Sequence, residues 1–398
     1  MKVAVVTPYL PYPPDTGGKS RSFHLLRGLS RQHTVDLFTV SYDPQSTDAA
    51  AVQALRDFCT AHVIKLQKNP DTRARLVRAF DPLPRVVDHF HTPFSLTEVR
   101  QQLQEGKYDL LIVDEICMTP YGQGFPGPKL VIRHKVDHVH YREVAATQPL
   151  GIRKLIQWVD AYKLRRYEQR AMTQFHTAVC CSEDDAAIMR ALNPEVPLTV
   201  IGNGVDLSYF APLEELPGPP TLLYMGTMHY YPNIDAVHYF FRTIHPQLVQ
   251  LVPDVQAWIV GHNPPADILA WQRLPGVTVS GSVPDVRPYL KKSLATIVPL
   301  RLGSGTRLKI LESIAAQRPV ISTSVGAEGL GLRHDEHLLI ADDPGEFAKQ
   351  TAELLRNPAL RQRLIAAARP VVATRYSWQA LGEQYEGVCR EVAGRGTV

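Results

Sequence analysis

The sequence lacks the features that would place the protein across a membrane, outside the cell or on nucleic acid. No apolar run approaches the ~20 residues of a membrane-spanning helix, and residues 1–8 lack the length and cleavage site of a secretory signal. The five cysteines are odd in number, scattered and without metal-ligand spacing, which is typical of reduced thiols. The net charge of +4 is too small to indicate a nucleic-acid partner. We therefore expect a cytoplasmic protein that binds no nucleic acid.

The composition is that of a globular protein, with 44% hydrophobic and 21% charged residues in a chain of 398. This length favours two domains, each large enough to bury its own core. Turn-forming residues at 202–206 are followed by four prolines between Pro212 and Pro220. Such a segment is typical of a linker, so we place the domain boundary there.

Short apolar runs recur on both sides of this boundary, and segments with helical spacing separate them. Continuous apolar runs are typical of strands buried on both faces of a parallel sheet, so the pattern predicts an α/β protein with two Rossmann-like domains and a ligand site between them. The runs lie at 2–7, 35–40, 108–114, 129–133 and 177–181, and then at 221–226, 257–261, 277–281, 295–299, 319–323 and 338–340.

The stretch from 298 to 321 begins as a strand, breaks at Gly303–Gly305 and resumes with helical spacing. A glycine-rich turn that opens a helix presents unpaired N–H groups and the positive end of the helix dipole, which suits an anion. Arg307 and Lys309 add two cations, and Glu312 adds a hydrogen-bond acceptor. Phosphate at the helix start and hydroxyls at the carboxylate would suit a sugar nucleotide. The alternative is an ordinary strand-to-helix connection with a solvated polar face.

Two further segments follow predicted strands. A Pro- and Gly-rich loop with Gly17 and Gly18 follows the first strand, where open α/β sheets bind ligands; the pair either lets a substrate approach the backbone or only makes the turn. The segment from His134 to His138 follows the strand at 129–133. We favour proton or hydroxyl handling there, with Asp137 taking a proton and His134 binding a hydroxyl, over a bland polar loop or a metal site.

Two stretches bear on surface contacts. Basic residues at 71–78 and an apolar, irregular stretch at 83–90 either touch an anionic membrane or form a solvated face. The long helix predicted over 152–172 carries a stripe through Leu155, Trp158 and Tyr162, which we expect to face the core, with the many Arg and Lys residues outward.

Taken together, four segments resemble the donor domain of the GT-B glycosyltransferases, in particular glycosyltransferase family 4. They are 224–233, 280–285, 298–312 and 318–329. The N-terminal loop with its glycine pair, the segment 134–138 and the segment 203–206 fit the same group.

The resemblance implies two facing Rossmann-like domains with a deep cleft between them. Residues 1–205 would bind the acceptor, 206–377 would bind the donor, and 378–398 would form a helix that returns to the first domain. It also implies a retaining hexosyltransferase that moves sugar from a UDP- or GDP-sugar to a sugar, lipid-linked or other hydroxyl acceptor in polysaccharide or glycoconjugate synthesis. The enzyme would be cytoplasmic, with peripheral contact at the inner face of the membrane.

By the same resemblance Glu312 would bind the ribose, and Arg307 and Lys309 the diphosphate. His134 and Asp137 would face the transferred sugar and the acceptor. The remaining donor-site positions would be Gly18, Gly226, Thr227, Val283, Ser304, Gly305, Thr306 and Leu308.

One position departs from the family pattern: Ser304 stands where the family often has a glutamate, eight positions before Glu312. Serine cannot carry a negative charge, so the contact to the donor sugar differs there. No Asp-x-Asp triplet is present to hold a divalent ion, so we expect neither metal nor cofactor. The alternative is a nucleotide-sugar-binding protein on the same fold that is non-catalytic or catalyses another reaction.

Overall fold

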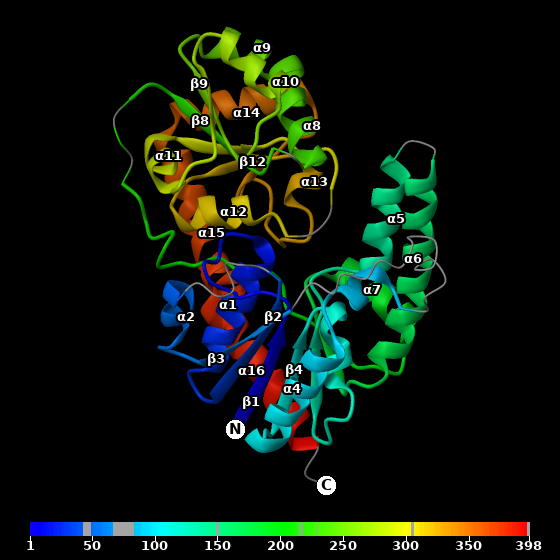
Figure 1. Cartoon of the computed structure of the whole chain (residues 1–398). Helices are drawn as coiled ribbons and strands as arrows, with labels where there is room; N and C mark the ends of the chain where they lie inside the picture. Colours follow the sequence, from blue (N-terminus) through cyan, green and yellow to red (C-terminus); the bar gives the residue numbers. More distant parts are fainter. Residues whose placement is uncertain are drawn as a thin grey trace. The chain divides into compact units, whose positions relative to one another are not determined.

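The computed structural model describes residues 1–42, 49–66, 83–148, 151–214, 216, 218–228, 230–303 and 306–395 (Figure 1). The chain divides into two compact units, Met1–Gly202 with Leu381–Val398, and Asn203–Ala380. Each unit is a parallel sheet with helices, so the expected α/β class with two Rossmann-like units is confirmed.

Unit 1 is built on seven strands in the order β3-β2-β1-β4-β5-β6-β7, all of them parallel. Apart from the lysines that begin β1 and β5, the central strands are buried along their whole length, which explains why they are continuous apolar runs. The strands are β1 (Lys2–Thr7), β2 (Thr34–Ser41), β3 (Thr60–Lys65), β4 (Leu110–Asp114), β5 (Lys129–Ile132), β6 (Thr177–Cys180) and β7 (Leu198–Val200).

Helices connect these strands, and side-chain caps fix where several of them begin. Thr16 caps the first helix through the N–H of Lys19, and Ser182 caps α7 through the N–H of Asp185. The helices are α1 (Gly17–Leu29), α2 (Ala49–Leu55), α3 (Arg85–His89), α4 (Pro93–Gly106), the 3₁₀ helix η3 (Ile116–Gly122), α5 (Asp137–Thr147), α6 (Ile152–Met172) and α7 (Glu183–Leu192).

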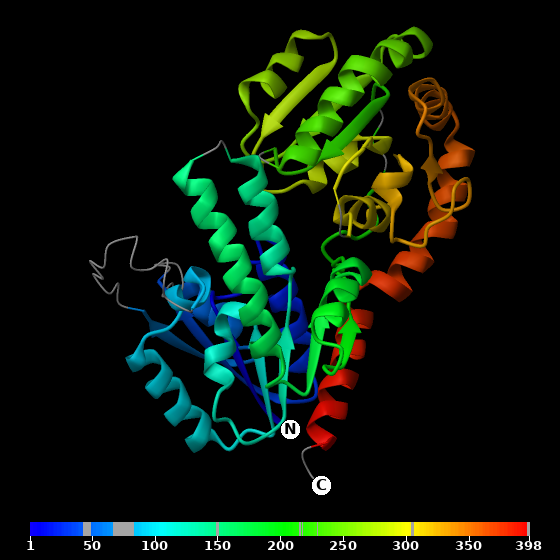
Figure 2. The same cartoon turned by 90° about the vertical axis from the view of Figure 1, so that its right-hand side faces the viewer.

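The helices α5 and α6 form an antiparallel hairpin that stands out from the rest of unit 1 (Figure 2). The predicted orientation of α6 is wrong. Leu155, Trp158 and Tyr162 are 63%, 44% and 55% exposed, whereas Asp160, Leu164 and Glu168 lie on the buried face. The buried face combines apolar residues (Ala161, Leu164, Ala171 and Met172) with two acids, Asp160 and Glu168, which pair with Arg85 and Arg133. This face, and not the apolar stripe, packs against the rest of unit 1.

Unit 2 has six parallel strands in the order β10-β9-β8-β11-β12-β13. Its core is one continuous apolar cluster on both faces of this sheet. The strands are β8 (Thr221–Met225), β9 (Gln256–Val260), β10 (Val277–Gly281), β11 (Ala295–Val298), β12 (Val320–Ser322) and β13 (Leu339–Ile340).

The helices of unit 2 alternate with its strands. They are α8 (Tyr231–Tyr239), the π-helical turn η4 (Phe240–Ile244), α9 (His245–Leu251), α10 (Ala266–Leu269), the 3₁₀ helix η5 (Ala270–Arg273), α11 (Arg287–Lys292), α12 (Leu308–Ala315), α13 (Ser324–Ala327), α14 (Pro344–Arg356) and α15 (Pro358–Tyr376).

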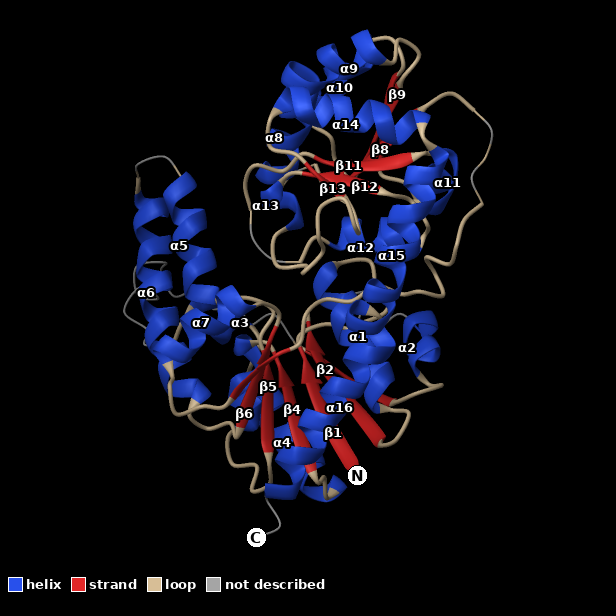
Figure 3. Ribbon diagram, turned by 180° about the vertical axis from the view of Figure 1, so that it is seen from behind, coloured by secondary structure: helices blue, strands red, loops and turns tan. Residues whose placement is uncertain are grey.

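The last helix, α16 (Trp378–Arg395), packs against the first helix of unit 1, as expected for a returning C-terminal helix (Figure 3). A Cβ atom added at Gly28 of α1 would lie 3.0 Å from the Cα atom of Gly382, so the two backbones touch at a pair of glycines. Farther along, His33 Nε2 lies 2.9 Å from Glu386 Oε1. Both contacts tie the chain's end to its beginning.

Candidate active site

The first cluster of functional side chains lies at the start of α12 in unit 2. The helix begins at Leu308, directly after Arg307, and its apolar face is completely buried, as its spacing predicts. Arg307 is itself buried, and Lys309 and Glu312 are partly buried. Because Lys309 and Glu312 are three residues apart, they lie on neighbouring positions of the helix surface. Ser304 and Gly305 fall outside the described residues, as does the basic segment 71–78.

Lys309 is held by two residues from β8 and α8. Its Nζ atom donates to Asn233 Oδ1 (2.8 Å) and to the Tyr224 hydroxyl (3.1 Å), and it lies 4.3 Å from the centroid of the Tyr224 ring. Tyr224 also donates to Asn233 Oδ1, and the Asn233 amide donates to the carbonyl of Thr227. This network fixes the ammonium group at the carboxyl end of β8.

Two glycines leave the space that this network occupies. A Cβ atom at Gly226 would lie 2.9 Å from both Lys309 Nζ and the Asn233 amide group. A Cβ atom at Gly261, at the end of β9, would lie 1.8 Å from the carbonyl oxygen of Gly226. The positions directly after β8 and β9 therefore require glycine, which explains the glycine that follows each of these strands.

Burial shifts the pKa values of Arg307, Lys309 and Glu312 in the directions that favour their neutral forms. Burial and the charge of Arg307 lower the pKa of Lys309 to about 7, although Glu312 opposes the shift. Burial likewise raises the pKa of Glu312 to about 7 against the effect of Lys309, and it lowers the pKa of Arg307. The Glu312 carboxylate makes no hydrogen bond or ion pair within the described part of the chain. The cluster thus holds two desolvated basic side chains, whose charged forms a bound anion would stabilise, and one acceptor with unused capacity, which suits an anionic, hydroxyl-bearing ligand.

Val283 lies beyond the end of β10, where it is partly buried against the core of unit 2. Next to it, Ser282 Oγ lies 2.5 Å from His262 Nδ1. Both residues belong to loops at the carboxyl edge of the sheet, the edge that also carries Lys309 and Gly226. This edge is where open α/β sheets bind ligands.

A second cluster lies at the carboxyl ends of β4 and β5 in unit 1. His134 Nε2 is 2.7 Å from Asp114 Oδ1, and Ser22 donates to Asp114 Oδ2 (2.5 Å). Burial lowers the pKa of His134, but the charges of Asp114 and Glu115 outweigh this and hold the pKa well above its usual value. These charges favour the protonated form of His134, one ring nitrogen of which is engaged by Asp114, and the residue is partly buried.

Gly18 lies in α1 of the same unit. A Cβ atom at Gly18 would lie 3.1 Å from the Tyr9 hydroxyl, which in turn lies 3.3 Å from Ser22 Oγ. Close contact with Tyr9 is thus a structural reason for glycine at this position, and it connects the N-terminal loop with Ser22 and Asp114.

Asp137 belongs to a buried network beneath His134. Its carboxylate accepts from Arg133 (3.0 Å), and its backbone N–H donates to Glu168 Oε1 (3.0 Å). Glu168 also accepts from Arg133 and contacts His138. Burial raises the pKa of Glu168, but Arg133 and His138 outweigh burial and lower it. Because Asp137 is 3% exposed and ion-paired, the geometry suits a positioning residue better than a group that meets substrate.

Sequence reasoning missed Asp114, Glu115, Glu168, Tyr224 and Asn233. A signal was present for the first two, because two carboxylates directly follow the apolar run of β4. No local pattern indicates Glu168, which reaches the site from the middle of a long helix.

The two histidines suggested as a metal pair contact different carboxylates, Asp114 and Glu168. Within the described ranges, no group of three or more His, Cys, Asp or Glu residues is arranged to hold a metal ion. Over the same ranges, no helix is both long and apolar enough to cross a membrane.

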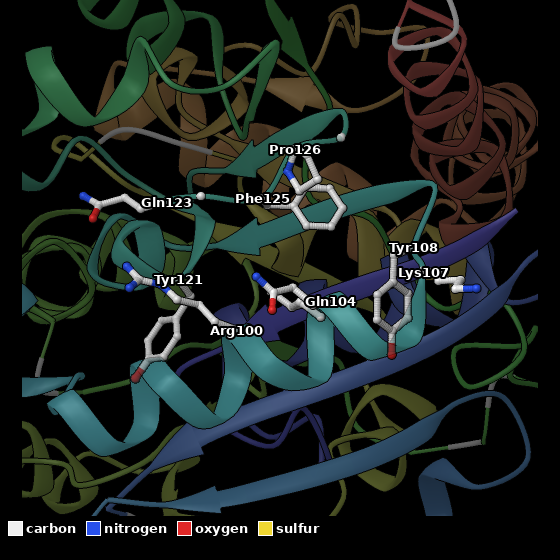
Figure 4. Close-up of a pocket in the computed structure, with 11 residues that line it drawn as sticks. Arg100, Gln104, Lys107, Tyr108, Tyr121, Gln123, Phe125 and Pro126 are labelled. Atoms are coloured by element: carbon white, nitrogen blue, oxygen red, sulfur yellow. The ribbon is translucent and has the colours of Figure 1, made fainter.

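A pocket of 620 Å³ lies elsewhere, at the opposite edge of the unit 1 sheet (Figure 4). It is lined by Arg100 and Gln104 of α4 and by Tyr108 and Phe125, which precede β4 and β5. The amino ends of those strands face away from His134, so this pocket is separate from the candidate site.

The fold and the two clusters define a protein of two Rossmann-like units, each with polar and charged side chains at the carboxyl edge of its sheet. Two family models match in tandem: "Glycosyltransferase Family 4" over residues 16–209 and "Glycosyl transferases group 1" over residues 219–357. The chain belongs to these glycosyltransferases, and its fold is GT-B.

Known proteins agree with this assignment. The phosphatidyl-myo-inositol mannosyltransferase of Mycobacterium tuberculosis is 33% identical over 211 residues, which are 49% of this chain and 54% of that protein. Among solved structures, sucrose-phosphate synthase from Thermosynechococcus elongatus aligns with a TM-score of 0.69 at 19% identity, covering 99% of this chain and 100% of that one. HepE of Anabaena, solved with UDP and glucose, aligns with a TM-score of 0.64 at 12% identity over 98% and 99% of the two chains.

Proposed function

We propose that this glycosyltransferase is a metal-independent, retaining hexosyltransferase that moves a sugar from a UDP- or GDP-sugar to an acceptor hydroxyl. The observation that carries the proposal is the cluster at α12, in which Arg307 and Lys309 are desolvated cations beside the unused carboxylate of Glu312. Support for the donor class comes from HepE, whose structure contains UDP and glucose.

In this proposal Arg307 and Lys309 bind the diphosphate, and Glu312 accepts hydrogen bonds from the ribose hydroxyls. The other donor contacts are those expected from the sequence. Cleavage of the bond between sugar and phosphate places negative charge on the leaving diphosphate. Cations that are already fixed in place stabilise that charge without reorganisation, which is usually a large part of catalysis. The Tyr224–Asn233 network supplies this rigidity for Lys309.

On the acceptor side His134 contacts a hydroxyl of the transferred sugar or the acceptor, with Asp114 fixing its ring. Asp137 acts through Arg133 and Glu168 as a positioning residue. Transfer with retention needs little from a separate base, because the departing diphosphate can take the acceptor proton. The acceptor is a sugar, lipid-linked or other hydroxyl compound, in keeping with the mannosyltransferase and synthase to which the chain is similar.

The test measures binding of UDP and GDP by calorimetry and turnover of their sugars with EDTA present. Lys309→Met is expected to weaken nucleotide binding by about 10- to 100-fold, since a hydrogen bond to a charged group contributes about 1.5–3 kcal/mol. Lys292→Met, at the exposed end of α11, is the matched control. Unchanged nucleotide affinity in Lys309→Met would show that the donor site is elsewhere. Nucleotide binding without turnover of any donor would favour a non-catalytic binding protein instead.

The proposal includes peripheral contact with an anionic membrane at its cytoplasmic face, and α6 supplies the surface that supports it. Ile152, Leu155, Trp158 and Tyr162 expose an apolar and aromatic stripe along the hairpin. Tyr162 also lines a groove of 470 Å³, together with Lys163, Arg166 and Arg170. Apolar and aromatic side chains beside clustered cations complement the acyl boundary and the phosphates of anionic lipid.

Sedimentation with phosphatidylcholine vesicles, with and without phosphatidylglycerol, tests this contact. The wild type is expected to bind only the anionic vesicles, and Leu155→Ser with Trp158→Ser is expected to abolish binding. Ile188→Ser removes an equally apolar exposed residue from α7 and should change nothing. If the double variant still binds anionic vesicles, the stripe is not the lipid-binding surface. If the wild type forms concentration-dependent dimers and the double variant does not, the stripe is an interface between two copies of the protein.

A further inference from the structure

Glu115 occupies a backbone conformation that a glutamate adopts only at a cost in free energy. It directly follows β4 with φ at 80° and ψ at 151°, a region that is essentially restricted to glycine. Its N–H donates to the carbonyl of Ile132 at the end of β5 (3.0 Å), so the backbone is pinned between two strands. A residue needed for the turn alone would be glycine, and strained non-glycine residues concentrate at functional sites.

The carboxylate of Glu115 makes no hydrogen bond or ion pair within the described ranges, although it is partly buried. Its neighbours are all engaged: Asp114 contacts Ser22 and His134, and Asp137 accepts from Arg133. Glu115 is therefore the acidic group of this cluster with unused acceptor capacity. A buried acceptor without a partner is unfavourable unless a ligand supplies the missing donor.

The charges around Glu115 restrict what that ligand can be. Asp114 and Asp137 raise its pKa, whereas His134 and Lys135 lower it, and Glu115 in turn raises the pKa of Arg133. Burial raises the pKa of Glu115 to about 7, His134 opposes this, and Asp137 and Asp114 add to it. Hydroxyl groups can donate the hydrogen bond that this carboxylate lacks, whereas an ionised phosphate or carboxylate has no hydrogen to donate to it.

We propose that Glu115 binds the acceptor, by accepting hydrogen bonds from its sugar hydroxyls beside His134. This inference rests on the proposed function and adds a residue and a ligand class to it. The reacting end of the acceptor is a neutral polyhydroxyl group, and any phosphate of a lipid-linked acceptor lies away from this cluster. The ionised carboxylate is the stronger acceptor, so acceptor affinity rises as Glu115 loses its proton near pH 7.

The experiment compares Glu115→Gln and Glu115→Gly with the wild type. Donor turnover is measured with UDP- and GDP-sugars, alone and with a panel of alkyl glycosides as acceptor probes. In Glu115→Gln, kcat/KM for the alkyl glycoside is expected to fall by about 10- to 100-fold. Nucleotide affinity stays unchanged, and the rising limb of the pH profile near pH 7 disappears. Glu115→Gly is expected to melt at a higher temperature than the wild type. Its donor turnover should nevertheless no longer be stimulated by the alkyl glycoside.

The matched control is Lys107→Gly, which relieves a positive φ of 50° at the exposed end of α4 and should leave the kinetics unchanged. The inference is overturned if Glu115→Gly melts higher and retains full stimulation, or if Glu115→Gln loses nucleotide affinity as well. If the wild type hydrolyses donor but no alkyl glycoside increases its turnover, the ligand of Glu115 is not a sugar acceptor. Failure of the wild type to bind any nucleotide would instead contradict the proposed function, so the two failures are distinguishable.

Discussion

Replacing Gly226 by alanine tests the geometry of the donor site with a single methyl group. The added Cβ would lie 2.9 Å from Lys309 Nζ, and equally close to the Asn233 amide. The Asn233 side chain is anchored to Thr227 and Tyr224, so Lys309 is the partner with room to move. The methyl group would push the ammonium away from its place at the end of β8.

Two costs follow from this displacement. Overpacking a close contact costs about 1–3 kcal/mol of stability, and separating Lys309 from Tyr224 and Asn233 loses hydrogen bonds worth about 1 kcal/mol each. We expect the free energy of unfolding to fall by about 3–5 kcal/mol in total. Loss of a charged contact to the diphosphate would weaken UDP or GDP binding by about 10- to 100-fold.

Urea unfolding and nucleotide titration measure these two effects on the same sample. Gly218→Ala is the control, because a Cβ at Gly218 meets nothing within 4 Å. If Gly226→Ala binds nucleotide as tightly as Gly218→Ala, the account of Lys309 as a diphosphate ligand held by this network is refuted, whatever the change in stability.

Three further predictions concern titration and packing. Glu312 has a folded pKa of about 7, above its usual 4.5, so its contribution to stability is lost as pH rises through 7. The free energy of unfolding of Glu312→Gln, relative to that of the wild type, should therefore rise by about 1–3 kcal/mol between pH 5 and pH 8 in urea titrations. A difference between the two proteins that does not change with pH would contradict this. Lys309 has a folded pKa of about 7, below its usual 10.5. The free energy of unfolding of the wild type should therefore rise relative to that of Lys309→Met as the pH increases from 7 to 10. If this difference does not change with pH, the Lys309 ammonium group is not desolvated. In thermal melts Gly28→Ala should destabilise because of its contact with Gly382, whereas Gly387→Ala, which meets nothing, should stabilise slightly; equal effects would argue against the α1–α16 contact.

The sequence predicted most of the fold because the signals for it are local. Strands such as β4 are apolar runs with no polar interruption, and the apolar spacing of α12 placed Ile310, Leu311 and Ile314 in the core. The glycine-rich turn at 303–305, followed by helical spacing, indicated an anion site at the start of α12. These features depend on neighbours in the chain and can be recognised without knowing the tertiary structure.

The parts that could not be predicted depend on contacts between distant residues. Local spacing predicts that the stripe on α6 is buried, yet Glu168 on the other face is the residue that reaches Arg133. The Asp137 carboxylate looks accessible in the sequence, but Arg133 engages it. The strain at Glu115 arises because its N–H is held by β5, which no sequence pattern records.

The central claim is sugar transfer from a nucleotide donor at α12, and the anomeric configuration of the product tests it most directly. The protein is incubated with UDP- or GDP-hexoses and alkyl glycosides, and NMR follows the product and the released nucleotide. The account predicts release of a nucleoside diphosphate, a glycoside with the donor's anomeric configuration, and loss of both in Lys309→Met. Inverted configuration, or undiminished turnover in Lys309→Met, would contradict it.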